Sequence, residues 1–248
     1  MNLYIDIGNS RIKWLLGDSD SDTINSHPLG VVDLAAELSE CWNNEPVPER
    51  IIVASVGTKN ITDVVDTVCE GLWSKKTEYL TVQKEFCDVI IAYDDTDKLG
   101  VDRWLVLIAA FNQYRTNLCI VDCGTAVTVD VISATGKHQG GYIIPGADMM
   151  RHALVTDTER ILVSEEAKSS VNLGQSTDEC INNGIQLIVA SFIDRVVTSL
   201  EDQYQDNLKC ILTGGGAESV MKLITTKFIY EPNLVLYGVR QAGSIRKQ

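Results

Sequence analysis

The apolar positions of this chain alternate between the two-residue period of strands and the 3.6-residue period of helices. Residues 2–17 form two apolar stretches around a short polar turn, which predicts a β-hairpin. A helical pattern covers 31–44, an apolar strand covers 50–57, and a second helical pattern covers 60–72. Strands that alternate with helices in this way indicate an α/β domain.

The opening pattern returns in the middle of the chain. After a polar loop at 94–100 and a predicted helix from about Val101, a second strand, turn and strand occupy 118–132. Superposing the two hairpins pairs Asp6 with Asp122, Gly8 with Gly124, Asn9 with Thr125 and Ser10 with Ala126. We therefore predict two related α/β halves, 1–116 and 117–248, whose acidic turns face each other across a cleft. The alternative is two ordinary hairpins, in which Asp caps the turn and Gly permits a positive φ.

The rest of the second half continues the α/β pattern. A strand bounded by glycine and proline is predicted at 140–146, and a long helix from about Thr177 to Gln203. The glycines at 214–216 follow a strand and precede a helix, but the third glycine of the dinucleotide-binding GxGxxG motif is missing. This segment is either a helix-entry turn or a turn that lies against the adenosine of a nucleotide.

Composition and charge narrow the class of protein. The 248 residues include 45% hydrophobic positions, which suits one or two globular domains. A formal net charge of -13 repels polyanions, so we expect no nucleic-acid partner. The sequence has no signal-peptide pattern and no run of eighteen apolar residues, so we expect a cytoplasmic location and no membrane. Its seven cysteines include no CxxC pair, and neither a disulfide framework nor a zinc knuckle is predicted.

The two acidic turns suit the chemistry of a magnesium nucleotide. Backbone N–H groups of a glycine-containing turn approach phosphate oxygens closely, and a nearby lysine such as Lys13 adds a point charge. Mg²⁺ takes only one or two carboxylates from a protein, which Asp6 and Asp122 could supply. The motif GxxxxGK[ST] is absent, which argues against a P-loop kinase.

Transfer of a phosphoryl group to a hydroxyl calls for a general base near the acceptor. The three histidines do not lie beside a glycine-rich turn, so a carboxylate is the better candidate. In "LGVDRW", Asp102 could accept the hydroxyl proton while Arg103 binds an acceptor carboxylate through two hydrogen bonds. The alternative is an aspartate that is favoured in the first turn of a helix and paired with a surface arginine.

Five segments together carry a resemblance to a known family. "DIGNSRIK", "YDDTDKLGVDRW", "VDCGTAVTVDVI", "GGYIIPG" and "LGQSTDECINNG" resemble, in order and spacing, the type III pantothenate kinases of bacteria. The resemblance covers nearly the whole chain. It implies the fold of the acetate kinase, sugar kinase, Hsp70 and actin superfamily: two duplicated ribonuclease-H-like (actin-like ATPase) domains with a cleft between them.

The resemblance also implies an activity and its residues. The expected reaction is ATP-dependent phosphorylation of pantothenate to 4'-phosphopantothenate, the first step of coenzyme A biosynthesis, with Asp102 as the proton acceptor. The ATP-binding residues implied by the family are Asp6, Ile7, Gly8, Asn9, Ser10, Arg11, Ile12, Lys13 and Thr125. Those implied for the pantothenate pocket are Tyr93, Gly100, Val101, Asp102, Arg103 and Thr177. Asp122 matches a ligand of a monovalent cation, K⁺ or NH₄⁺, in addition to Mg²⁺ bound near Asp6 through water, and such enzymes are typically homodimers.

The chain departs from the family in its acidic Asp94–Asp95 loop, where members often have proline. Two other hypotheses stay open from the residues alone. The acceptor could be another small hydroxy compound, such as a sugar, because one fold serves many acceptors. The chain could also be a catalytically inactive nucleotide-binding regulator. Such a protein is expected to have lost its acidic positions, whereas Asp6, Asp102 and Asp122 are all present.

Overall fold

The structure, a computed structural model, describes residues 1–17, 23–156 and 170–245. The described chain divides into two compact units. One contains residues 1–112 together with the C-terminal stretch from Leu234, and the other contains residues 113–233. Each unit is described below by itself.

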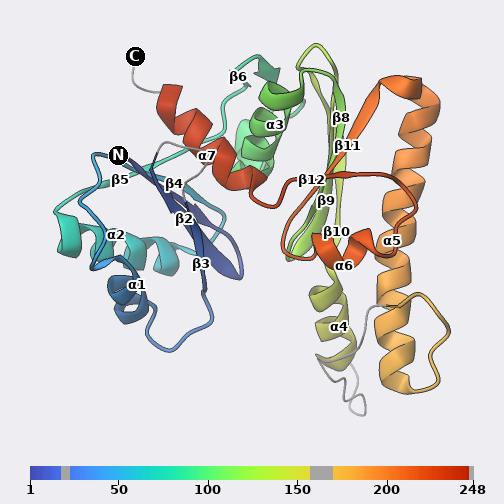
Figure 1. The fold of residues 1–248 in the computed structure, drawn as a ribbon, viewed down its shortest axis with the longest axis horizontal. Helices are drawn as coiled ribbons and strands as arrows, with labels where there is room; N and C mark the ends of the chain where they lie inside the picture. Colours follow the sequence, from blue (N-terminus) through green and yellow to red (C-terminus); the bar gives the residue numbers. More distant parts are fainter. Residues whose placement is uncertain (18–22, 157–169, 246–248) are drawn as a thin grey trace. The chain divides into compact units, whose positions relative to one another are not determined.

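The first unit is built on a five-stranded sheet in the order β3-β2-β1-β4-β5 (Figure 1). β1, β2 and β3 are antiparallel neighbours, whereas β4 and β5 run parallel to β1. The strand bounds are Leu3–Ile7 for β1, Arg11–Leu16 for β2, Ile24–Pro28 for β3, Ile51–Ser55 for β4 and Thr77–Tyr79 for β5. The predicted hairpin at 2–17 and the predicted strand at 50–57 are confirmed. β3 was not predicted, because its residues are polar or half-exposed and carry no alternating apolar pattern.

Two helices, α1 (Leu34–Trp42) and α2 (Lys59–Trp73), cover one face of this sheet (Figure 1). The backbone N–H of Ala36 donates to the Asp33 side chain, which caps the start of α1. Trp42 lies fully buried at the centre of this layer. Its ring meets Trp14 edge-on with centroids 5.6 Å apart and stacks on Trp73 at 5.8 Å.

The opposite face of the first sheet is covered by α7, the C-terminal helix Leu234–Ile245 (Figure 1). Arg50 donates to the carbonyl oxygen of Gly243 at 2.9 Å and forms two hydrogen bonds with Glu78 at 2.6 and 2.8 Å. The hydroxyl groups of Tyr4 and Ser244 lie 3.4 Å apart. The last helix of the chain therefore packs with the first strands, whereas the contiguous halves 1–116 and 117–248 would place it in the second half.

After β5, the chain of the first unit forms a few short elements and then one buried helix. β6 (Glu85–Phe86) and β7 (Val89–Ile90) pair as a small hairpin, and the short helix η1 (Thr96–Lys98) follows. The predicted helix from about Val101 is confirmed as α3 (Val101–Tyr114). Except for half-buried Asp102, every residue of α3 from its start to Phe111 is buried.

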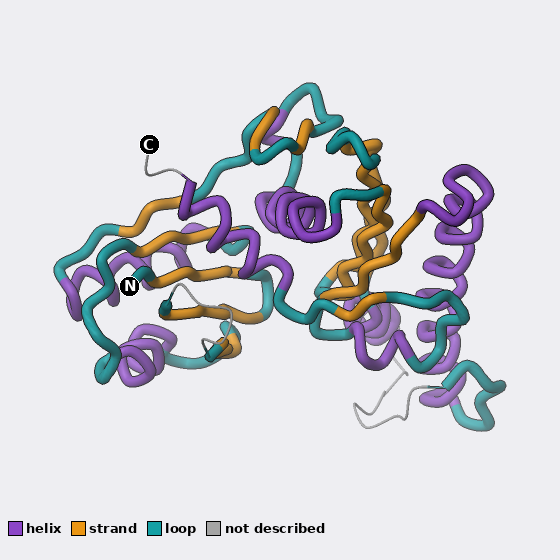
Figure 2. The backbone as a smooth tube through the Cα atoms, turned by 45° about the horizontal axis from the view of Figure 1, so that its top comes forward, coloured by secondary structure: helices purple, strands orange, loops and turns teal. Residues whose placement is uncertain are grey.

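The second unit repeats the topology of the first. Its sheet has the order β10-β9-β8-β11-β12, in which β8, β9 and β10 are antiparallel neighbours and β11 and β12 run parallel to β8. The strand bounds are Asn117–Cys123 for β8, Ala126–Ile132 for β9, His138–Pro145 for β10, Leu208–Thr213 for β11 and Ile229–Tyr230 for β12. In the backbone trace of Figure 2 the strands of each sheet are drawn in orange. The same strand order in both units is what a duplicated ribonuclease-H-like domain has, and it supports the superposition of Asp6 on Asp122.

The long helix α5 (Thr177–Tyr204) covers one face of the second sheet, within a residue of its predicted end. Buried apolar residues repeat along it at Ile185, Val189, Ile193 and Val197. By length and composition alone α5 is apolar enough to cross a membrane, but its buried stripe packs on the sheet as that of a core helix does. The other helices in the described part of this unit are α4 (Ala147–Thr156), η2 (Gln205–Asn207) and α6 (Ala217–Met221).

The packing of Trp42 generates a prediction about the stability of the first unit. Replacing Trp42 with alanine leaves a cavity between Trp14 and Trp73, so we expect the free energy of unfolding to fall by roughly 3–5 kcal/mol. Urea denaturation followed by circular dichroism measures this change. The control is Val47→Ala at a 63% exposed position, for which we expect less than about 0.5 kcal/mol. Equal effects of the two substitutions would contradict the assigned core.

Candidate active site

The first acidic turn is a tight hairpin between β1 and β2. Asp6 is the last but one residue of β1 and pairs with Lys13 on one side and with Ala54 of β4 on the other. The backbone N–H of Gly8 donates to the carbonyl oxygen of Arg11 at 3.0 Å, which closes the turn and leaves Asn9 and Ser10 exposed at its tip. The tip therefore presents two exposed residues beside the aspartate, the feature that a phosphate-binding turn requires.

Strand alternation divides the residues of this motif between two faces of the sheet. Asp6 and Lys13 are half-buried cross-strand neighbours on one face. Ile7 and Ile12 are cross-strand neighbours on the other face, and both are fully buried in the core. Of these four residues, only Asp6 and Lys13 can offer side chains to a ligand, and Ile7 and Ile12 are limited to backbone contacts.

The second acidic turn occupies the same place in the second unit. Asp122 is the last but one residue of β8 and pairs with Thr128 of β9 and Thr213 of β11. The pairing also corrects one detail of the superposition. Asp6 pairs seven residues ahead with Lys13, whereas Asp122 pairs six residues ahead, so the second turn is one residue shorter. Ala126 is consequently the first residue of β9 and does not match Ser10 at the tip.

Two other backbone segments contact the second turn. The backbone N–H of Gly146 donates to the carbonyl oxygen of Thr125 at 3.1 Å, and that of Gly216 donates to the carbonyl oxygen of Cys123 at 2.8 Å. Burial and the neighbouring Asp122 charge raise the pKa of the Cys123 thiol to about 12, so it is protonated at neutral pH. Thr125 is exposed and Asp122 half-buried, so both remain accessible beside these contacts.

The glycine segment 214–216 lies directly against the Asp122 carboxylate. A Cβ atom on Gly214 would collide with the Asp122 Oδ1 atom and with the Cys123 backbone, and Gly214 has a φ of +92°. Both facts require glycine at this position. The sequence predicts either a helix-entry turn or a turn against a nucleotide for this segment, but it does not reveal the contact with Asp122. The parallel pairing of β8 with β11 is the feature that brings the two together.

The predicted acceptor residues of the first unit form one cluster. Arg103 is 6% exposed, and its Nη1 donates to the Tyr93 hydroxyl oxygen at 3.0 Å. Its guanidinium carbon lies 5.7 Å from the centre of the Tyr93 ring. Lys84 Nζ donates to the Tyr93 carbonyl oxygen at 2.7 Å and anchors this residue from the neighbouring hairpin. Lys84 was not predicted, because a single lysine outside any motif gives no signal.

Asp102 lies in the first turn of α3, and its orientation is defined by local contacts. The Asp102 Oδ1 atom accepts a hydrogen bond from the Arg103 backbone N–H at 2.8 Å. A Cβ atom on Gly100 would collide with the same oxygen, so the carboxylate folds back over the glycine. Val101 is buried beside it. The structure thus gathers Tyr93, Gly100 and Val101 to Arg103 within the first unit, with Asp102 at the surface of the group.

Thr177 belongs to the second unit, where it is the first residue of α5. The backbone N–H of Glu179 donates to the Ser176 side chain at 3.2 Å, and the Glu179 carboxylate accepts from the Gln175 backbone N–H at 2.7 Å. The first bond is the N-cap of α5 and the second ties the residue before the cap to the same turn, which places Thr177 at the start of the helix. Thr177 lines a groove of about 750 Å³ together with apolar residues that include Leu154, Ile181 and Ile188.

Comparison with known proteins identifies the family. A sequence model described as type III pantothenate kinase matches residues 2–199. The type III pantothenate kinase of Nitrosococcus oceani is 37% identical over 98% of this chain and 94% of its own length. That of Dichelobacter nodosus is 33% identical over 96% of both chains. The chain belongs to the type III pantothenate kinase family.

The solved structures support the fold of this family member. The ROK hexokinase of Thermus thermophilus matches 99% of this chain and 99% of its own with a TM-score of 0.51 and 12% identity. At this identity the likeness bears on the fold alone. Together with the repeated strand order, it confirms the duplicated actin-like ATPase fold that the sequence predicted.

No cluster of three or more metal-binding side chains is present among the described residues of this kinase. Nucleotide-bound Mg²⁺ keeps several waters and takes one or two carboxylates from the protein. Asp6 and Asp122, each near the end of a central strand, have the right chemistry for such a role. Carboxylate and backbone oxygens are equally suited to K⁺, a hard cation.

The contact between Gly214 and Asp122 generates a prediction. Gly214→Ala must relieve a collision with a carboxylate and the backbone while holding a φ of +92°, so we expect a loss of roughly 1–3 kcal/mol in the free energy of unfolding. Gly215→Ala is the matched control, because a Cβ atom there meets nothing within 4 Å. Chemical denaturation of both variants measures the difference. A Gly214→Ala variant as stable as Gly215→Ala would show that the turn does not press on Asp122.

Proposed function

We propose that this chain transfers the γ-phosphoryl group of ATP to the terminal hydroxyl of pantothenate, giving 4'-phosphopantothenate in the first step of coenzyme A biosynthesis. Membership of the type III pantothenate kinase family over nearly the whole chain supports this reaction. The observation that carries the assignment to residues is the buried Arg103 guanidinium bonded to Tyr93 directly beside Asp102.

Asp102 is the general base in this proposal. Pantothenate has a carboxylate at one end and the reacting hydroxyl at the other, and it would lie with Tyr93, Gly100, Val101, Arg103 and Thr177 around it. Arg103 attracts the carboxylate, because a guanidinium held in place by Tyr93 is pre-organised to donate. Asp102 accepts the hydroxyl proton as the oxygen attacks the γ-phosphorus and the bond to the ADP oxygen breaks.

ATP is held by residues of both acidic turns in this proposal. Residues Ile7 to Ile12 surround the phosphates, the backbone N–H groups of the exposed tip residues Asn9 and Ser10 next to Gly8 contact them most closely, and Lys13 and Arg11 supply positive charge. Thr125 contacts the same nucleotide from the second turn. Mg²⁺ near Asp6 through water and K⁺ or NH₄⁺ at Asp122 would neutralise phosphate charge, and most of the acceleration comes from this and from positioning.

An acceptor panel in two salts tests this function. ADP release is measured with pantothenate, with a hexose and with no acceptor, in K⁺ and then in Na⁺. We expect release only with pantothenate and more of it in K⁺. ADP release with a hexose but not with pantothenate would show that the acceptor is a sugar and not pantothenate. Equal rates in the two salts would remove the monovalent cation from the proposal.

The general base is tested by Asp102→Asn, which keeps the shape of the side chain but cannot accept the proton. We expect kcat to fall roughly 10²- to 10⁴-fold while ATP binding is preserved. Asp97→Asn is the matched control, because Asp97 is an exposed carboxylate in the neighbouring short helix η1. Steady-state kinetics and nucleotide titration measure both effects. A kcat of Asp102→Asn close to that of Asp97→Asn would exclude the role.

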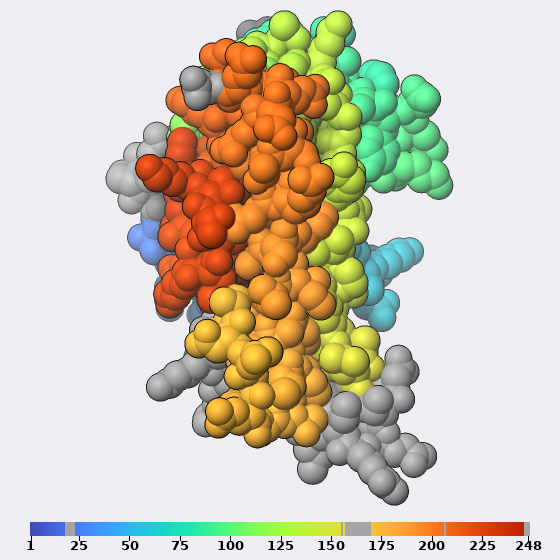
Figure 3. All heavy atoms as spheres, turned by 90° about the vertical axis from the view of Figure 1, so that its right-hand side faces the viewer, coloured from blue at the N-terminus to red at the C-terminus, as the bar shows by residue number. Residues whose placement is uncertain are grey.

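We also propose that the enzyme is a cytoplasmic homodimer. Large apolar side chains are exposed on α4, β10 and α5: Tyr142, Ile143, Met149, Leu154, Leu187 and Ile188. Figure 3 shows α5 as a long orange ridge on the face of the second unit turned to the viewer. Exposed apolar groups of this extent commonly mark a protein interface.

A charge placed on α5 tests the dimer. Ile188 is 55% exposed and lines the groove that contains Thr177, so Ile188→Asp would bury a carboxylate at the interface and weaken it. We expect light scattering to give twice the chain mass for the wild type and a shift towards the monomer for the variant. The control Val32→Asp changes an exposed valine of the first unit and should leave the mass unchanged. A monomeric wild type would contradict the proposal.

A further inference from the structure

Two cysteines lie side by side on adjacent strands in the centre of the second sheet. Cys119 of β8 and Cys210 of β11 are direct partners in the parallel register, so their side chains leave the same face of the sheet. Adjacent strands lie about 4.7–4.9 Å apart, which is within the range of Cα distances of roughly 4.4–6.8 Å that a disulfide spans. Both thiols belong to one buried cluster with Val189 and Ile193 of α5.

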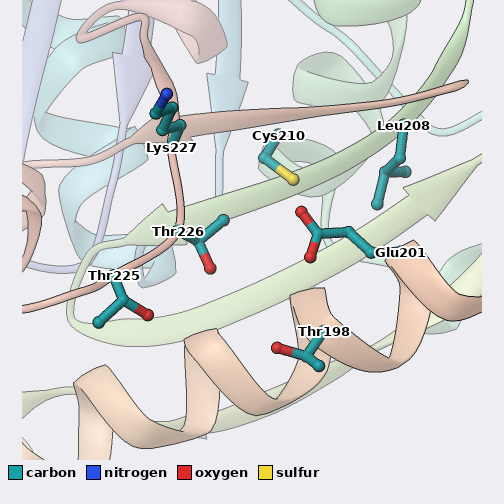
Figure 4. A pocket seen from close by; sticks show the side chains of 7 residues that line it. All are labelled: Thr198, Glu201, Leu208, Cys210, Thr225, Thr226 and Lys227. Atoms are coloured by element: carbon teal, nitrogen blue, oxygen red, sulfur yellow. The ribbon is translucent and has the colours of Figure 1, made fainter. Parts of the chain in front are cut away.

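A pocket of about 440 Å³ reaches one of these thiols. Its lining residues are Thr198, Glu201, Leu208, Cys210, Thr225, Thr226 and Lys227 (Figure 4). The Cys210 sulfur points into the pocket towards the side of the Glu201 carboxylate, whereas the Lys227 ammonium points away from it (Figure 4). Cys119 is fully buried behind Cys210 and does not line the pocket.

The far wall of the pocket is fixed to α5. The Asp194 carboxylate accepts hydrogen bonds from the backbone N–H groups and the hydroxyls of Thr225 and Thr226, at 2.8–3.1 Å. Burial opposes ionisation of Asp194, but these hydrogen bonds outweigh it and lower the pKa of the carboxyl. Asp194 therefore stays charged at neutral pH, and the pocket is a built feature of the unit.

We propose that Cys210 and Cys119 form an oxidant-reactive thiol pair, in which the pocket admits hydrogen peroxide to Cys210 and Cys119 closes a disulfide. No other pair of the cysteines in the described residues combines strand pairing with a pocket. This assignment is independent of the kinase reaction.

The chemistry balances with peroxide as the two-electron oxidant. The Cys210 sulfur, its proton passing to a base such as Glu201, attacks one peroxide oxygen; the O–O bond breaks, and water and a sulfenic acid form. The Cys119 sulfur then attacks the Cys210 sulfur, the S–O bond breaks, and the hydroxyl leaves as water with the Cys119 proton. Two thiols are oxidised to one disulfide, and one peroxide is reduced to two waters.

The order of the two thiols follows from their surroundings. The neighbouring Cys210 thiol and burial raise the pKa of Cys119 well above that of an ordinary thiol, so Cys119 keeps its proton until a partner sulfur is oxidised. Cys210 lines the pocket and Cys119 does not, so Cys210 is the thiol that small molecules can reach. Cys210 is consequently the attacked residue and Cys119 the resolving one.

The experiment uses the other cysteines as internal controls. The exposed or half-exposed thiols are first replaced by serine at Cys41, Cys87 and Cys180, which leaves four buried ones. Cys69 and Cys123 are as buried as the pair, but they line neither of the two described pockets. The folded protein is treated with hydrogen peroxide, blocked with iodoacetamide under denaturing conditions and digested for mass spectrometry.

We expect a linked peptide pair joining Cys119 to Cys210, lighter by two hydrogen atoms than the sum of the free peptides and separated again by dithiothreitol. Cys69 and Cys123 should stay reduced over the same time of peroxide treatment and should therefore be found alkylated by iodoacetamide. In Cys119→Ala the linked pair should vanish, and Cys210 should be trapped as a sulfenic acid by dimedone. Thr198→Trp, at an exposed position of the pocket wall, should slow the linkage at least several-fold without lowering the thermal transition.

Three results would overturn the proposal. The first is a Cys119 and Cys210 pair that stays reduced while the exposed cysteines of the unmodified chain are oxidised. The second is oxidation of all four buried cysteines at one rate, which would mean that peroxide acts on unfolded protein. The third is a linkage rate that Thr198→Trp leaves unchanged, which would show that the pocket is not the route.

Discussion

The parallel pairing of a central strand with the strand beyond it is the constraint on which both candidate turns depend. In the first unit β1 lies between antiparallel β2 and parallel β4, and in the second unit β8 lies between β9 and β11 in the same way. An aspartate occupies the last but one position of each central strand. Because the two parallel strands end and the antiparallel strand begins at the same edge, its carboxylate is held beside a turn that the backbone N–H of Gly8 or Gly124 closes.

The same pairing explains how the following segment supports each turn. After β4, the backbone N–H of Val56 donates to Ile7, and after β11 that of Gly216 donates to Cys123. In both units the chain thus returns to the residue that precedes the turn glycine. In the second unit the return is closer still, because Gly214 lies against the Asp122 carboxylate itself. This contact limits the positions that the carboxylate can adopt, which is what an electrostatic site requires.

Local pattern accounts for much of the fold and of the candidate site. The two hairpins, the helix from Val101 and the long helix from Thr177 follow from apolar periodicity and turn residues, and they lie where the sequence predicts them. The polar edge strand β3 was missed because an exposed strand has no apolar face to reveal it. The return of α7 to the first sheet was missed because its contacts with Tyr4 and Arg50 join the two ends of the chain.

The sequence reveals the candidate site only in part, for similar reasons. The sequence nominated Asp102 and Arg103 through one short motif, but only the folded chain shows that Tyr93 holds the guanidinium and that Lys84 holds Tyr93. Spacing also cannot reveal a register. The facing of Cys119 and Cys210 depends on which residues of two strands pair, 91 positions apart, and no local pattern encodes it. The sequence also does not show which residues of a motif can contact a ligand only through their backbone. Ile7 and Ile12 are such residues, because their side chains are buried.

The proposed function requires that both acidic turns bind one nucleotide. The most direct test is a crystal structure of the protein with a non-hydrolysable ATP analogue and Mg²⁺. The account predicts that the backbone N–H groups of Asn9 or Ser10 and the hydroxyl of Thr125 contact the phosphates of the same analogue. A triphosphate that touches only one of the two turns, or that binds away from both, would contradict it.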